Sequence, residues 1–249
     1  MMTERDKTLP LVKMMVNSLK IPLTCKMRLG WDDENLTAPE FAQALEDAGV
    51  AAITVHGRTR EQGFSGHVNL SGIRAVVQAV KSIPIIGNGD ITTPLMAKKM
   101  FEETGCAAIS IGRGAFYNPW IFMHIQHYLR MGEELPAPHF EERIQVMTRH
   151  LDLMVQVFGE ELGCRMFRKV GPWYAKRLGP AAEFNRRIVC LNSRAEFDDI
   201  IISYRAWRQP IVESQPKQPS PLSEKMEKHP IPAADRTAIP VPKGPQEWW

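Results

Sequence analysis

The chain has 249 residues, a net charge of +3, 44% apolar residues and 24% charged residues. Such a chain can bury a sizeable core as one large or two small domains, and this small net charge does not by itself indicate a nucleic-acid partner. It contains no secretory signal, no CxxC pair among its four cysteines and no apolar run near the ~18 residues of a membrane span. We therefore expect a cytoplasmic protein with free thiols, without a membrane span or a metal site.

Residues 10 to 131 alternate between short apolar runs and longer amphipathic stretches. The strand candidates are residues 22–28, 51–56, 84–87 and 107–111. The helix candidates are residues 10–20, 38–48, 70–80, 93–104 and 118–129. Strand–helix alternation at about 30 residues per unit predicts βαβ units and a parallel sheet, and the apolar strands predict a sheet covered on both faces. A doubly wound sheet and part of a barrel both fit this pattern.

Residues 138–208 contain no strand pattern and are predicted to form a small all-α domain. Its helix candidates are residues 140–158, 165–176, 181–191 and 194–207. The remaining residues, 209–249, are rich in proline and show little periodicity, so they are predicted to be a disordered or extended tail. The predicted domains are therefore residues 1–131, 138–208 and the tail.

A short polar cluster follows each predicted strand. The clusters are Lys26-Met27-Arg28, His56-Gly57-Arg58, Asn88-Gly89-Asp90 and Gly112-Arg113-Gly114. Ligands of parallel α/β folds bind at the carboxyl ends of strands, so four such clusters predict one shared site. Glycines permit close backbone approach and arginine binds phosphate oxygens, so the favoured ligand is an anion, with a phosphate as the first choice. Taken singly, each cluster is also compatible with an ordinary turn.

At these residues the sequence resembles the tRNA-dihydrouridine synthases, especially their bacterial branch. The four matching blocks are PLTCKMRLGWDD, ITVHGRTREQGFSG, PIIGNGDI and AISIGRGAFYNPWIF. The helical segment RKVGPWYAKRLGPAAEFNRRI resembles that family's C-terminal domain more loosely. The resemblance implies the C-terminal half of an aldolase-type (β/α)8 TIM barrel followed by a small all-α domain.

The resemblance also implies a flavoenzyme that uses FMN and NADPH to reduce uridine in tRNA to 5,6-dihydrouridine. Lys26 would lie at the flavin ring and uracil, and His56 at the flavin or its phosphate chain. Arg28 and Arg58 would face the open mouth of the site, where tRNA arrives. The phosphate cradle implied by the family comprises Asn88, Gly89, Asp90, Gly112 and Arg113.

One family motif is missing from this sequence. The family's general acid is a cysteine in an Asn-x-Gly-Cys-Pro loop, and this sequence contains no such loop. We expect the chain to correspond to the second half of the barrel, so that it is poorly stable alone or pairs with another copy of itself. The alternatives are an inactive RNA-binding remnant, or another FMN-dependent oxidoreductase acting on a small molecule.

Basic residues gather in the predicted helical domain, with Glu183 as the one acid within the run. The proposed RNA-contacting set is Arg168, Lys169, Lys176 and Arg177. From charge alone, this run is equally typical of a solvated helix face and of a phosphate-contacting surface. The family resemblance favours tRNA as the partner.

Overall fold

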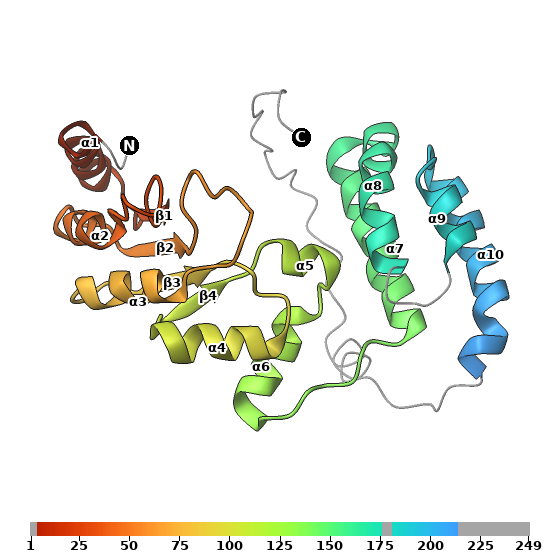
Figure 1. Ribbon diagram of the computed structural model, residues 1–249. Helices are drawn as coiled ribbons and strands as arrows, with labels where there is room; N and C mark the ends of the chain where they lie inside the picture. The colour runs from red at the N-terminus through yellow and green to blue at the C-terminus, as the bar shows by residue number, and fades with distance from the viewer. Residues whose placement is uncertain (1–3, 176–180, 214–249) are drawn as a thin grey trace. The chain divides into compact units, whose positions relative to one another are not determined.

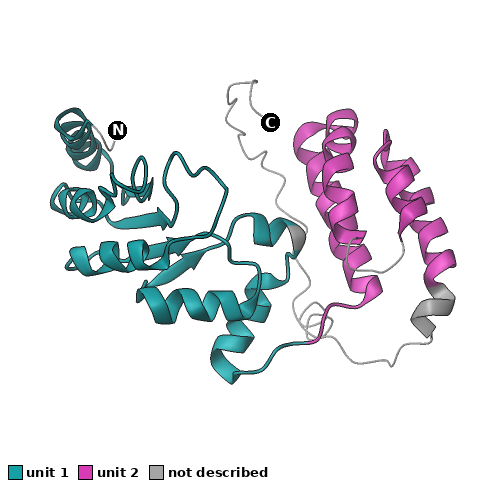
Figure 2. Ribbon diagram, in the orientation of Figure 1, with its two compact units in different colours: residues 1–135 teal, residues 136–249 magenta. Residues whose placement is uncertain are grey.

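The computed structural model describes residues 4–175 and 181–213. The chain divides into two compact units, Met1–Leu135 and Pro136–Trp249 (Figure 2). The first unit contains every strand of the described chain, whereas the described part of the second unit is helical.

The first unit contains one parallel sheet whose four strands follow chain order, β1-β2-β3-β4 (Figure 1). The strands are β1 (Thr24–Arg28), β2 (Ala52–His56), β3 (Ile85–Asn88) and β4 (Ala108–Ser110). The helices are α1 (Arg5–Ser18), α2 (Ala38–Asp47), α3 (Leu70–Ala79), α4 (Pro94–Thr104), α5 (Arg113–Tyr117) and α6 (Ile121–Met131). Successive strands are neighbours in a (β/α)8 barrel, whereas a doubly wound sheet reverses its strand order. The strand order therefore confirms the predicted α/β class and favours part of a barrel.

The two faces of the sheet differ in character because successive side chains point to opposite sides. Met27, Ile53, Val55 and Ile85 are buried on one face in a core that includes residues of α2, α3 and α4. The other face carries polar side chains near the strand ends, and Lys26 on that face is exposed. The expectation that both faces are covered is thus wrong for the described chain.

The helix boundaries depend on local capping. Thr93 accepts a hydrogen bond from the backbone N–H of Met96, and Gly105 ends α4 in a left-handed conformation that suits glycine. Thr37 makes no such cap on α2, although its sequence fits a capping box. The short helix α5 was not predicted, because Gly112 and Gly114 flank its start in sequence and glycine is a poor helix former.

The second unit consists of four described helices. They are α7 (Phe140–Phe158), α8 (Glu160–Ala175), α9 (Ala182–Ile188) and α10 (Arg194–Glu213). Phe167 and Phe197 meet edge-to-face at a centroid distance of 5.8 Å in its buried core. Helix α10 continues to Glu213, so the first residues of the predicted tail are helical. Residues 214–249, Lys176 and Arg177 lie outside the described residues.

Candidate functional site

The predicted polar residues meet in one row across the carboxyl edge of the sheet. In the strand register, Arg28 is paired with His56, His56 with Asn88, and Asn88 with Ser110. Paired residues of parallel strands point to the same face, so the row places these four side chains together on the open face of the sheet. Lys26 lies two residues before Arg28 and shares that face.

Hydrogen bonds connect this row across three strands. The Lys26 ammonium donates to Asn88 Oδ1 at 2.8 Å, and Asn88 Nδ2 donates to the carbonyl of Ser110 at 2.7 Å. Burial, and then the neighbouring Arg28 charge, lower the pKa of Lys26. The amide of Asn88 thus has one fixed orientation, and it holds a cationic group over the sheet.

A cavity of about 220 Å³ opens beside the row. His56, Asn88, Gly89, Asp90, Gly112 and Arg113 are among its lining residues. Gly89 has a φ of +128°, and a Cβ built there would lie 2.5 Å from Val68 Cγ2 and 3.1 Å from His56 Cδ2. A Cβ at Gly112 would meet no atom within 4 Å, so the absence of a side chain there leaves open space beside the backbone.

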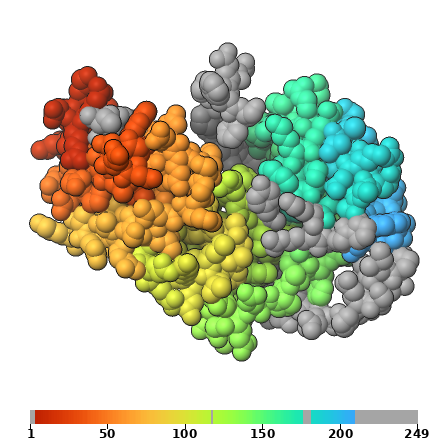
Figure 3. All heavy atoms as spheres, viewed as in Figure 1, coloured from red at the N-terminus to blue at the C-terminus, as the bar shows by residue number. Residues whose placement is uncertain are grey.

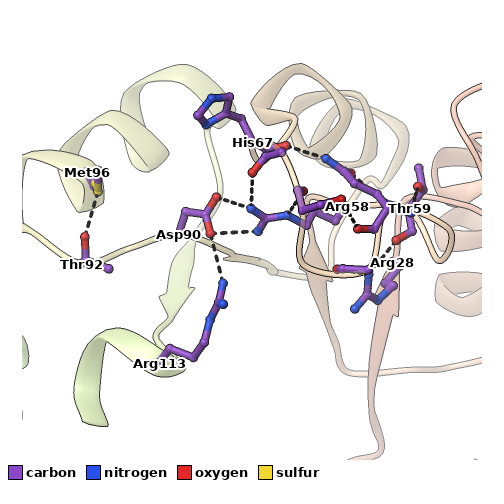
Figure 4. Close-up of polar contacts among 12 residues, drawn as sticks. Arg28, Arg58, Thr59, His67, Asp90, Thr92, Met96 and Arg113 are labelled. Carbon is purple, nitrogen blue, oxygen red and sulfur yellow. Dashed lines mark hydrogen bonds and ion pairs between the residues drawn. The ribbon is translucent and has the colours of Figure 1, made fainter. Parts of the chain in front are cut away.

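The Asp90 carboxylate lies between two guanidinium groups (Figure 4). Arg58 donates to both its oxygens, at 2.9 and 2.6 Å, and Arg113 lies 3.5 Å from Oδ1. The hydrogen bonds from Arg58 lower the pKa of Asp90 against the opposing effect of burial. Asp90 is therefore a neutralised carboxylate, and exposed Arg113 provides the guanidinium that borders the cavity.

The structure corrects the expected place of Arg58, which does not face the open mouth of the site. Its side chain is 2% exposed, and it also donates to the carbonyls of Ser65 and Gly66 at 3.0 and 2.7 Å. All three guanidinium nitrogens of Arg58 donate hydrogen bonds within the protein, to these carbonyls and to Asp90. Arg58 therefore fixes the loop after β2 against Asp90.

Arg28 also holds this loop, and Phe64 marks its tip. Arg28 donates from Nη1 to the carbonyls of Thr59 and Gly63 at 2.6 and 2.7 Å. The Phe64 ring is 66% exposed, with the Arg28 and Arg113 guanidinium carbons 5.5 and 5.0 Å from its centroid. Sequence reasoning did not single out Phe64, although it stands within the HGRTREQGFSG block that carries the resemblance.

His56 is buried at the floor of the cavity and is neutral at pH 7. Burial, followed by the Arg28, Lys26 and Arg58 charges, lowers its pKa to about 4. A neutral imidazole can both donate and accept a hydrogen bond, so His56 is suited to a polar ligand group without adding charge. Cys25, on the opposite face of β1, packs against the core as its position in the strand predicts.

The basic residues of the second unit divide by their partners. Arg168 is used within the unit, because it donates to the Leu191 carbonyl at 2.8 Å and to Asn192 Oδ1 at 2.6 Å. Lys169 is exposed on α8. Across residues 4–175 and 181–213, no cluster of three or more metal-ligating side chains and no helix able to cross a membrane is found.

The chain is similar to known proteins along most of its length. A family profile described as dihydrouridine synthase (Dus) matches residues 1–206. A probable tRNA-dihydrouridine synthase of Rickettsia bellii is 40% identical over 189 residues, which are 76% of this chain and 58% of that protein. The tRNA-dihydrouridine synthase B of Escherichia coli K12 is 40% identical over 189 residues, which cover 76% of this chain and 59% of that protein.

These comparisons also describe the extent of the match. The chain spans 58% and 59% of the length of these two relatives. A solved structure of phosphonopyruvate hydrolase with oxalate and Mg²⁺ shares 16% identity over 81% of this chain and 76% of that chain, with a TM-score of 0.40. The profile match and the 40% identity show that the chain belongs to the dihydrouridine synthase family, with bacterial relatives.

Proposed function

We propose that this chain contributes the flavin-phosphate site and a uridine-facing lysine to the FMN-dependent, NADPH-driven reduction of tRNA uridine to 5,6-dihydrouridine. One observation carries the proposal. A glycine-lined cavity, the Arg113 guanidinium and the Lys26 ammonium, which donates a hydrogen bond to Asn88, lie together at one edge of the sheet. The names of the relatives support tRNA as the substrate class.

The cavity fits the phosphate end of FMN. Gly89 and Gly112 expose backbone rather than side chains, and Arg113 offers a charged fork suited to phosphate oxygens. Asp90 does not oppose an anion with a full charge, because Arg58 pairs with both its oxygens. The Asn88 amide accepts a hydrogen bond from Lys26 and donates one to the Ser110 carbonyl, and these two bonds fix its position in the wall of the cavity.

The residues of the open face suit the reacting end of the cofactor. When bound, FMN would supply the hydride that reduces the uracil 5,6 double bond, and NADPH would restore the reduced flavin. The reduction also takes one proton, which the family draws from a cysteine that this sequence does not contain. Lys26 places a positive charge where negative charge would develop on the ring system, and the bond to Asn88 fixes its position. His56 remains neutral at pH 7 and offers a hydrogen bond to the cofactor.

The RNA is proposed to meet both units. In the second unit, Lys169 is exposed for contact with a phosphate, whereas Arg168 acts by holding the turn at Leu191 and Asn192. In the first unit, the exposed Phe64 ring lines the cavity, and the Arg28 guanidinium lies against that ring. Lys176 and Arg177 remain candidates from sequence.

Titration of the full chain with FMN, followed by flavin fluorescence, tests the cofactor site. Arg113→Ala should weaken FMN binding about tenfold or more, since a charge-assisted hydrogen bond is lost. Arg130→Ala on α6 is the matched control and should bind FMN like the wild type. If Arg113→Ala and the wild type bind FMN with equal affinity, this cavity is not the phosphate site of FMN.

Incubation with NADPH and an unmodified tRNA transcript, with dihydrouridine measured by mass spectrometry, tests the reaction. Product that depends on Lys26 supports the proposal, and Lys26→Met should abolish it while FMN remains bound. If the chain binds FMN but not tRNA, the result would favour a small-molecule oxidoreductase. If it binds tRNA but not FMN, the result would favour an RNA-binding remnant.

A further inference from the structure

A second cavity, of about 310 Å³, lies within the helical unit between α9 and α10. Its wall includes Phe184, Arg187, Ile200, Ser203, Tyr204 and Trp207. This volume is at the lower end of the ~300–1,000 Å³ range of small-ligand pockets. None of these residues lines the cavity of the first unit, so the second cavity is a separate feature. Helices α9 and α10, cyan and blue, both contribute to the surface seen in Figure 3.

The wall of this cavity presents a fixed aromatic surface. Trp207 stacks on Tyr204 with an interplanar angle of 14° and a centroid distance of 6.1 Å. Tyr204 in turn packs against Phe184 at 4.7 Å, and both of these rings are buried. Trp207 nevertheless remains 51% exposed. A half-exposed indole that is held by a buried ring is a preformed platform for another flat group.

The polar part of the wall comprises Arg187, Ser203 and Glu183, and the Glu183 carboxylate is paired with Arg186. Arg187 donates from Nη1 to the hydroxyl of Ser203 at 3.1 Å, and no carboxylate pairs with it among the described residues. Its neighbour Arg186 differs, because two of its three guanidinium nitrogens donate to the Glu183 carboxylate at 2.9 and 2.7 Å. Within the described residues Arg187 thus forms no close ion pair, although the Glu183 carboxylate acts on it at longer range, and its charge lies next to the aromatic platform.

We propose that this cavity receives an unpaired nucleotide of an RNA, with its base stacked on Trp207 and its phosphate paired with Arg187. Single-stranded nucleotides are recognised by aromatic stacking together with basic groups, and this cavity combines the two. An apolar protein segment would match the rings but leave the Arg187 charge without a partner. This inference rests on the proposed function, in which tRNA is the substrate, and adds a contact in the second unit.

The test is the affinity of the full chain for an unmodified tRNA transcript, measured by filter binding at several salt concentrations. Trp207→Ala should weaken binding about tenfold through loss of one stacked base, and Trp207→Phe should retain most of the affinity. Ile202→Ala is the control, because Ile202 is 63% exposed on the same helix and does not line the cavity. A single-stranded oligonucleotide should compete with the tRNA through this site better than a duplex of the same length.

Arg187→Ala supplies a second readout. It should weaken binding and reduce the slope of log Kd against log salt by about one, whereas Trp207→Ala should leave that slope unchanged. Arg205→Ala is the matched control, because Arg205 is already paired with Glu141 at 2.9 Å. Thermal melting by circular dichroism checks folding, and Arg187→Ala decides the question if Trp207→Ala melts early.

The outcomes separate this inference from the proposed function. A wild-type chain that binds tRNA, with equal affinity in Trp207→Ala and Arg187→Ala, would overturn the nucleotide site and leave the proposed function standing. A Trp207→Ala variant with unchanged RNA affinity but altered sedimentation would show a protein contact instead, which also overturns it. A wild-type chain that does not bind tRNA would remove both.

Discussion

Arg58 and Asp90 form a two-pronged ion pair between the loop after β2 and the end of β3, with N–O distances of 2.9 and 2.6 Å. The Arg58 guanidinium is buried, whereas the Asp90 carboxylate is partly exposed at the cavity. The ion pair therefore fixes the loop after β2 at the edge of the site. Asp90 itself has a φ of +52°, which is unusual for a residue with a side chain. The pair therefore also helps to hold a strained turn.

Removal of Arg58 should destabilise the protein. Arg58→Ala takes the Arg58 hydrogen bonds away from the Asp90 carboxylate and from the Ser65 and Gly66 carbonyls, at a cost of about 3 kcal/mol in the free energy of unfolding. Urea unfolding followed by circular dichroism measures this loss. Arg60→Ala, at an exposed neighbouring arginine, should stay within about 0.5 kcal/mol of wild type. If both variants unfold at the same urea concentration as wild type, the pair has no structural role.

The two cavity glycines should respond differently to an added methyl group. Gly89→Ala should cost about 2 kcal/mol, since its φ of +128° is disfavoured for other residues and the Cβ would collide with Val68. Gly112→Ala should leave the urea midpoint nearly unchanged, because its Cβ enters open space, but should weaken FMN binding. A destabilised Gly112→Ala variant with full flavin affinity would contradict the proposed cradle.

Acid should destabilise the protein through His56. The folded-state pKa of about 4 lies below the ~6.5 of an unfolded chain, so the unfolded state binds more protons between these values. Stability from the neutral ring is therefore present above about pH 6.5 and falls as the pH decreases towards 4. NMR titration of the imidazole should give a midpoint near 4, and His56→Gln should flatten this part of the stability profile. A midpoint near 6.5 would show that burial does not act on this ring.

Glu46 should also contribute stability that acid removes, but over a lower pH range than His56. Its carboxylate accepts hydrogen bonds from the backbone N–H groups of Lys81, Ser82 and Ile83 at 2.7–3.2 Å, and from the Ser82 hydroxyl at 2.8 Å. The hydrogen bond from Lys81 is the largest cause that lowers its pKa to about 2. This contribution is present above about pH 4.5 and disappears as the pH falls through 2.

The Glu46→Gln variant tests that contribution. It should unfold at a lower urea concentration than wild type at pH 7, and the difference should shrink steadily below pH 4.5. Asp47→Asn, at the exposed adjacent carboxylate, is the matched control. A difference that is constant between pH 7 and pH 2 would show that the charge of Glu46 does not matter.

Much of the fold follows from local patterns. The strands and most helices of the first unit lie within a few residues of their predicted bounds, because apolar runs and helix stop signals such as Gly105 act over one or two turns. Two features at helix starts do not follow from local patterns, because Thr37 makes no cap on α2 and α5 begins at Arg113. A cap requires a particular backbone geometry, and the conformation at Gly112 depends on contacts beyond its neighbours.

The sequence by itself determined the parallel α/β class, the helical second unit and the polar strand ends that form the site, because these depend on periodicity and on chain order. Only the tertiary structure decided what each side chain does there. Arg58 is turned inward by Asp90 and two carbonyls, Phe64 stands between Arg28 and Arg113, and Trp207 is held on Tyr204. The contacts that Arg58 makes with Asp90 and that Phe64 makes with Arg28 and Arg113 join separate strands and loops, so no spacing along the chain encodes them. Tyr204 and Trp207 are three residues apart on α10, and helical periodicity already places them on one side of that helix.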